Sequence, residues 1–86
     1  LAVRGDETAV DCGCGTGRLT AELLERLPAG RVIAVDRSRN MLAGAAAFLR
    51  PRFGDRVAFR QADLQTFESN ELGEQVDLVF STATFH

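Results

Sequence analysis

Residues 8–24, TAVDCGCGTGRLTAELL, decide the fold of this chain. A short apolar run ends at Asp11, glycines follow at positions 13, 15 and 17, and apolar residues at helical spacing begin at once. The pattern predicts a strand, a tight glycine turn and a helix. Glycine suits the turn because it adopts backbone angles closed to other residues and lets a ligand approach closely. Since unpaired N–H groups at a helix start favour polar or anionic groups, the stretch predicts a nucleotide-type ligand over the turn.

Three further segments predict strands. Residues 32–35 form a continuous apolar run, which is typical of a parallel strand buried on both faces. Residues 57–61 alternate in character, which indicates a strand nearer the edge of the sheet. Residues 76–80 predict another buried strand, and the polar residues 64–75 before it predict an irregular turn or a short helix.

Two helices lie between the first three predicted strands. The first ends near Pro28. The second is capped by Ser38 or Asn40 and is expected to end at Pro51. Gly44 and the three alanines that follow it should keep this helix thin and allow close packing on the sheet.

Strands that alternate with helices predict right-handed crossovers and a parallel sheet. The fold class is therefore α/β, a Rossmann-like doubly wound sheet of which this chain holds the first four strands. The expected strand order is 3-2-1-4, because the first strand must lie between its neighbours for the glycine turn to sit at the switch point.

Composition narrows the function classes. The 86 residues are 45% hydrophobic and 26% charged, as expected of at most one globular domain. A net charge of −2 makes no electrostatic case for nucleic-acid binding, and the ten basic residues are all Arg, which indicates coding bias. No apolar stretch is long enough to span a membrane and no charged leader precedes one, so neither membrane insertion nor secretion is expected. The oligomeric state stays open.

Cys12 and Cys14 form a C-x-C pair that could suggest a metal or redox site. Two ligands do not make a metal site, and cysteines two apart on an extended chain rarely reach disulfide geometry. We therefore expect two small reduced residues in the turn, no metal, and a reducing, cytoplasmic compartment.

Acidic residues end three of the predicted strands, at Asp11, Asp36 and Asp63. Ligands of doubly wound sheets lie at the carboxyl ends of the strands, so these acids and residues 81–86 should converge on one edge. Asp36 lies 19 residues after Gly17, near the spacing at which a carboxylate binds the two ribose hydroxyls; its alternative role is to cap the next helix, and both roles can hold together.

Two residues, Asp63 and Met41, are candidates for contact with the adenine end of the ligand. Asp63, with the Ala62 backbone beside it, is expected to accept a hydrogen bond from the exocyclic amine of adenine, or else to cap the following turn. Met41 could lie against the adenine face, or belong to the core as most methionines on a helix stripe do.

The glycine spacing separates two families of nucleotide-type sites. The dinucleotide pattern G-x-G-x-x-G started at Gly13 would need a glycine at position 18, which is Arg18. The observed D-x-G-x-G-x-G resembles the first motif of class I S-adenosylmethionine-dependent methyltransferases. The segments VIAVDRS, RQADL and VDLVFSTATFH resemble the next three motifs, in order and over essentially the whole chain.

This resemblance implies S-adenosyl-L-methionine as cofactor. In the family an acid at Asp11 helps to orient the methionine end, and the glycine backbone contacts the amino-acid part. The last motif resembles small-molecule enzymes of the trans-aconitate or ubiquinone-biosynthesis type and lacks the N/D-P-P-Y/F signature. The cofactor-binding residues expected on this basis are Asp11, Gly13, Cys14, Gly15, Gly17, Asp36, Arg37, Met41, Ala62, Asp63, Leu64 and Ser81.

The implied reaction is in-line attack of a small-molecule acceptor on the sulfonium methyl, which needs positioning and exclusion of water and neither a metal nor a covalent nucleophile. No catalytic residue is identified. His86 has a suitable unperturbed pKa for a base but is as readily a solvated chain end.

Residues 1–86 are expected to be the N-terminal, cofactor-binding half of one domain, inactive alone, because a class I domain continues through three more strands. Two alternatives stay open, an NAD-binding oxidoreductase fragment and a noncatalytic module that binds an adenosyl cofactor.

Overall fold

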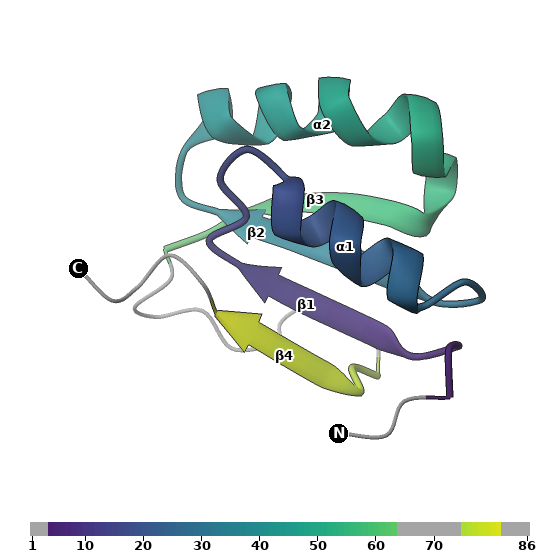
Figure 1. Ribbon diagram of the computed structural model, residues 1–86. Coiled ribbons are helices and arrows are strands. Elements are labelled where there is room, and N and C mark those ends of the chain that lie inside the picture. Colours follow the sequence, from purple (N-terminus) through teal and green to yellow (C-terminus); the bar gives the residue numbers. More distant parts are fainter. Residues whose placement is uncertain (1–3, 64–74, 82–86) are drawn as a thin grey trace.

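The computed structural model describes residues 4–63 and 75–81 and contains one parallel four-stranded sheet (Figure 1). The strand order β3-β2-β1-β4 is the predicted 3-2-1-4, so the doubly wound α/β topology is confirmed. Helices α1 and α2 lie in the two crossovers that join the first three strands. The strands are β1 Thr8–Cys12, β2 Arg31–Asp36, β3 Val57–Gln61 and β4 Leu78–Ser81, and the helices are α1 Arg18–Arg26 and α2 Arg39–Phe53.

Both helices pack on the same face of the sheet (Figure 1). The core between them and the strands includes Leu24 and Leu49, which are fully buried. On the opposite face, alternate residues of the two central strands form a second, smaller cluster of Val10, Ile33 and Val35. Strand β2 is buried on both faces, as its unbroken apolar run predicted.

Helix α1 ends before Pro28, as predicted, and its last carbonyl groups are capped by a distant arginine. Arg56 lies in a short 3₁₀ turn, Gly54–Arg56, just before β3. Its guanidinium donates to the carbonyl oxygens of Leu24 (2.7 Å), Leu27 (2.5 Å) and Gly30 (3.0 Å). Since the end of a helix leaves carbonyls without intrahelical partners, Arg56 joins the end of α1 to the start of β3.

Two predictions about α2 are wrong. The helix continues through Pro51 to Phe53, because a proline in the last turn removes one hydrogen bond to an exposed part of the helix, and the chain leaves only at Gly54, where φ is +57°. Gly44 does not assist packing on the sheet, since it faces solvent with nothing within 4 Å of an added Cβ. Of the two predicted caps, Ser38 is the one used, and its Oγ accepts from the Met41 N–H at 3.2 Å.

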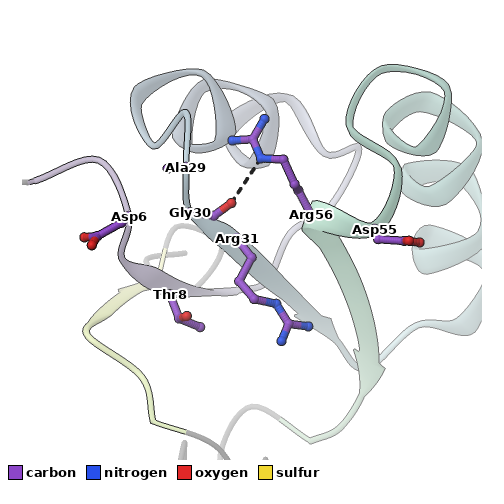
Figure 2. Close-up of a pocket in the computed structure, with 7 residues that line it drawn as sticks. All are labelled: Asp6, Thr8, Ala29, Gly30, Arg31, Asp55 and Arg56. Atoms are coloured by element: carbon purple, nitrogen blue, oxygen red, sulfur yellow. Dashed lines mark hydrogen bonds between the residues drawn. The ribbon is translucent and has the colours of Figure 1, made fainter.

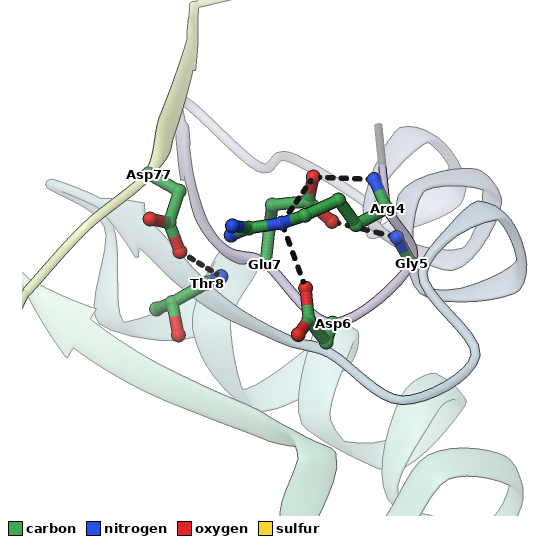
Figure 3. Close-up of polar contacts among 6 residues, drawn as sticks. All are labelled: Arg4, Gly5, Asp6, Glu7, Thr8 and Asp77. Atoms are coloured by element: carbon green, nitrogen blue, oxygen red, sulfur yellow. Dashed lines mark hydrogen bonds and ion pairs between the residues drawn. The ribbon is translucent and has the colours of Figure 1, made fainter. Parts of the chain in front are cut away.

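At the amino end of β1, one buried acid organises the backbone (Figure 3). The Glu7 carboxylate accepts from the N–H groups of Arg4 (2.6 Å) and Gly5 (2.8 Å). The Arg4 hydrogen bond is the largest cause that lowers the pKa of Glu7 below its ordinary value. Asp77 accepts from the Thr8 N–H at 2.9 Å and ties the approach to β4 to the start of β1.

Candidate functional site

The carboxyl ends of all four strands meet at one edge of the sheet. Cys12 is in register with Val35 of β2 and with Ser81 of β4, and Asp36 is in register with Gln61 of β3. The glycine turn, Asp36, residues 62–63 and Ser81 therefore lie along this edge, which is the convergence that the sequence predicted.

The glycine turn is held to β2 by its own backbone. The N–H groups of Gly13 and Cys14 both donate to the Val35 carbonyl oxygen, at 2.7 and 3.1 Å. Gly17 donates to the Cys14 carbonyl at 2.9 Å. These three N–H groups donate hydrogen bonds within the fold, so they are not donors for a ligand.

Glycine has a different structural reason at two positions of the turn. Gly17 has φ +91°, and a Cβ there would meet Leu49 Cδ1 at 3.0 Å and Ala45 Cβ at 3.3 Å, so the turn packs tightly on α2. Gly15 has φ +55° and open space beside it, with only the Met41 Cε atom within 4 Å, at 3.9 Å. Side-chain packing requires glycine at position 17, whereas the absence of a side chain at Gly15 leaves room for a ligand.

Asp36 bridges the two turns that flank the site. One carboxylate oxygen accepts from the Gly15 N–H at 3.2 Å, and the other accepts from the Ser38 N–H at 2.9 Å. Its exposed fraction is 9%. Because Ser38 is the helix cap, Asp36 does not cap α2, and its carboxylate is oriented by backbone donors while each oxygen keeps further acceptor capacity.

Asp11 is fully buried beneath the start of α1. Its Oδ2 accepts from the Thr20 hydroxyl at 2.6 Å, whereas its Oδ1 has no hydrogen-bond partner among the residues that the structure describes. Burial raises the pKa of Asp11, Thr20 opposes the rise, and the charge of Asp36 adds to it. Helix α1 has Gly17 as its N-cap residue, with no side-chain cap and no acid in its first turn, so the buried Asp11 carboxylate is the acid held against this helix start.

The two cysteines are free thiols in different environments. Cys12 packs with the cluster on the open face of the sheet, whereas Cys14 is buried with the helix-side core. Burial, followed by the charges of Asp36 and Asp11, raises the pKa of Cys14 to about 12. Both are thus unreactive thiols at neutral pH, in keeping with the packing role predicted for them.

The remaining predicted residues lie around the ends of β2 and β3. The Ala62 N–H donates to the Asp36 carbonyl at 3.1 Å, which places the exposed Asp63 immediately beyond. Arg37 is exposed, and its carbonyl accepts from the Gln61 side chain at 3.1 Å. Met41 is 40% exposed, so it is not the plain core residue that was its alternative. Leu64 and His86 fall outside the described residues.

A pocket of about 350 Å³ opens at the other end of the sheet (Figure 2). It is lined by the first residues of β1 and β2, Thr8 and Arg31, and by Asp55 and Arg56. The Arg56 guanidinium is already engaged by the α1 carbonyls, and Asp6 and Asp55 lie on opposite sides of the opening (Figure 2). The pocket therefore lies apart from the edge where the predicted residues converge.

Residues 4–63 and 75–81 contain no group of three or more His, Cys, Asp or Glu side chains that could hold a metal ion. None of the helices in those ranges is long and apolar enough to cross a membrane.

Comparison with known proteins gives consistent matches. A family described as "Methyltransferase domain" matches residues 9–86. The chain is 42% identical over 74 residues to a trans-aconitate 2-methyltransferase of Deinococcus radiodurans, covering 86% of this chain and 25% of that protein. It is 42% identical over 77 residues to a malonyl-[acyl-carrier protein] O-methyltransferase of Acetivibrio thermocellus, covering 88% of this chain and 25% of that protein. The chain thus spans about a quarter of the length of these relatives.

Among solved structures, the fold superposes on coclaurine N-methyltransferase bound to N-methylheliamine and SAH, with a TM-score of 0.77 and 26% identity. The superposition covers 92% of this chain and 22% of that enzyme.

Proposed function

The chain belongs to the methyltransferase-domain family, and from this premise we propose that it serves methyl transfer from S-adenosyl-L-methionine to a small-molecule acceptor, the described residues binding the cofactor. The family match confirms the resemblance to class I S-adenosylmethionine-dependent methyltransferases that the motifs indicated, and with it the cofactor of that class. The names of the two curated relatives support a small-molecule acceptor.

The residues present fit this cofactor in three respects. Open space lies beside Gly15, where a Cβ would intrude. The first turn of α1 has no side-chain cap, so its N–H groups suit the carboxylate of the methionine end. The unpartnered Oδ1 of Asp11 suits a cationic group.

The observation that carries the proposal is the orientation of Asp36. A carboxylate fixed by the backbone N–H groups of Gly15 and Ser38 presents its remaining lone pairs in a defined direction. Such a fork matches the two vicinal hydroxyls of a ribose, and its charge would repel a 2′-phosphate.

We assign the other predicted residues to the two ends of the cofactor. Asp63 would accept from the exocyclic amine of adenine, with the half-exposed Met41 over the turn on the adenine face. The methionine end would lie along the glycine turn beside Asp11. The complete proposed set is Asp11, Gly13, Cys14, Gly15, Gly17, Asp36, Arg37, Met41, Ala62, Asp63, Leu64 and Ser81.

When bound, S-adenosylmethionine supplies a methyl group on a positively charged sulfur. The thioether that departs when this methyl group is transferred is already a good leaving group. The role of this chain is therefore to bind and orient the cofactor, since correct positioning lowers the barrier of such a bimolecular step. Asp36 would fix the ribose, and the turn that it holds would fix the direction of the methionine chain. No described residue is assigned as a general base.

Calorimetry on the full-length protein tests the proposal. S-adenosylmethionine and S-adenosylhomocysteine should bind, and NAD should bind at least about ten-fold more weakly. NAD binding of equal or greater strength would refute the cofactor site. Asp55→Ala is a matched control, because Asp55 is an exposed acid beside the pocket at the opposite end of the sheet.

The acceptor class needs a separate assay. Transfer of a labelled methyl group to a panel of small carboxylic acids and phenols should exceed transfer to RNA or to protein. Preferential labelling of either macromolecule would overturn the small-molecule acceptor while leaving the cofactor site intact. Binding of the cofactor without transfer to any acceptor would favour a noncatalytic module.

We also propose that residues 1–86 form the N-terminal, cofactor-binding half of a methyltransferase domain, in the cytoplasm. Two observations support this: Val79 of the outer strand β4 is 58% exposed, and Cys12 and Cys14 are free thiols. Expressed alone, these residues should self-associate and lack methyl transfer. A monodisperse monomer in sedimentation, with turnover equal to that of the full-length protein, would contradict the proposal.

A further inference from the structure

Thr20 is a buried residue that no sequence motif singled out. It is the third residue of α1, it is fully buried, and its hydroxyl donates to Asp11 Oδ2 at 2.6 Å. A helical threonine commonly bonds a carbonyl of the preceding turn, and as a β-branched residue it is a modest helix former. Its hydroxyl is instead directed from the helix to the end of strand β1.

This hydrogen bond decides which oxygen of Asp11 is available. A hydroxyl has one proton to donate, so Thr20 satisfies Oδ2 and leaves Oδ1. Oδ1 is buried and has no partner among residues 4–63 and 75–81. Burial of an unsatisfied carboxylate oxygen is unfavourable, which points to a donor that joins the site with a ligand.

The surroundings of Asp11 indicate the charge of that donor. Asp36 lies near enough to raise the pKa of Asp11, and both carboxylates, after burial, raise the pKa of the Cys14 thiol. The region thus disfavours a further negative charge and favours a cation. Of the groups at the methionine end of the cofactor, the ammonium is the cationic hydrogen-bond donor.

We propose that Thr20 is a positioning residue that fixes the Asp11 carboxylate so that Oδ1 accepts from the ammonium group of the cofactor. The inference rests on the proposed function. Thr20 itself does not touch the cofactor: without its hydroxyl, the carboxylate is free to rotate toward the N–H groups at the start of α1.

The test compares two variants of the full-length protein with two probes. Thr20→Val removes the hydroxyl at nearly constant volume, and Thr20→Ser keeps it. S-adenosylhomocysteine carries the amino-acid end, whereas 5′-methylthioadenosine lacks it. Calorimetry should show that Thr20→Val weakens S-adenosylhomocysteine binding about 5- to 20-fold, because the hydrogen bond to the ammonium is misdirected but not removed. Binding of 5′-methylthioadenosine should be unchanged in Thr20→Val, and Thr20→Ser should bind both probes as the wild type does.

The pH profile gives a readout that a merely structural role would not change. The Thr20 bond lowers the pKa of Asp11, so its loss raises that pKa further. As the pH falls, S-adenosylhomocysteine affinity should therefore decline at a higher pH in Thr20→Val than in the wild type, while 5′-methylthioadenosine shows no such difference.

The outcomes separate this inference from the function on which it rests. Equal weakening of both probes, or unchanged S-adenosylhomocysteine binding in folded Thr20→Val, would overturn the role of Thr20 alone. If Thr20→Val does not fold, Asp11→Asn decides, and normal S-adenosylhomocysteine affinity in that variant would overturn it. A wild-type protein that binds neither probe would overturn the proposed function and this inference together.

Discussion

Substitution of Asp36 by alanine should weaken the cofactor by an amount that its contacts allow to be estimated. The proposed ribose site supplies two hydrogen bonds to a charged acceptor. At about 1.5–3 kcal/mol for bonds to a charged group, not fully additive, the dissociation constant of S-adenosylhomocysteine should rise roughly 10- to 150-fold.

The same substitution has a structural cost, because the carboxylate also accepts from the Gly15 and Ser38 N–H groups. Both groups lie in partly buried turns, so about 1–3 kcal/mol of stability should be lost. Asp36→Asn keeps the side-chain volume but replaces one acceptor with a donor, and its effect on both quantities should be intermediate.

Calorimetry with S-adenosylhomocysteine and urea unfolding of the same full-length samples separate the two effects, with Asp55→Ala as the control acid. A folded Asp36→Ala variant with an unchanged dissociation constant would refute the reasoning. Asp36 would then serve only to bridge the two turns.

Three further predictions concern stability. Arg56→Ala should lower the free energy of unfolding in urea by about 2–4 kcal/mol, because three carbonyl acceptors lose a charged donor. Arg52→Ala breaks an exposed 2.6 Å ion pair with Glu25 and should lower it by less than about 1 kcal/mol. Equal losses in the two variants would contradict the capping role of Arg56. Gly17→Ala should destabilise by about 2 kcal/mol or more through strain and overlap with α2, while Gly44→Ala, on an open helix face, should stabilise by about 0.5–1 kcal/mol. The pKa of Glu7 is lowered in the fold, so its contribution is present above the ordinary value of 4.5 and lost as the pH falls through the lower folded value. In acid unfolding, Glu7→Gln should not show the loss of stability that protonation of Glu7 causes in the wild type. An acid-unfolding curve identical to that of the wild type would show that the carboxylate is not coupled to folding.

Local sequence signals predicted the sheet and the placement of the site. The apolar run of β2 and the glycine pattern after β1 each determine one element, and chain order then restricts the parallel sheet to very few arrangements. Asp11, Asp36 and Asp63 could be placed on one edge because each lies within two residues of the carboxyl end of a strand.

What the sequence did not reveal depends on contacts between distant residues. Arg56 caps a helix whose carbonyl groups lie 29 and 32 positions earlier in the chain, and nothing in its local sequence marks it. Glycine was assigned a packing role at position 44, but the contact with α2 is made by Gly17 instead. The role of Thr20 is equally invisible, because a threonine in a helix has no pattern that reports a partner nine residues away on a strand.

The two acids of the site also show why residue type alone underdetermines function. Asp11 and Asp36 are both buried carboxylates, but one is held by a side-chain hydroxyl of α1 and the other by backbone N–H groups of two turns. The first retains an unsatisfied oxygen deep in the fold, whereas the second keeps acceptor capacity at the rim. Burial of the Asp11 carboxylate opposes folding and is the main cause of its raised pKa, and the charge of Asp36 adds to the rise. A ligand with hydroxyls at one end and a cation at the other would offset it at both carboxylates, so the arrangement that weakens the fold is also the one that selects such a ligand.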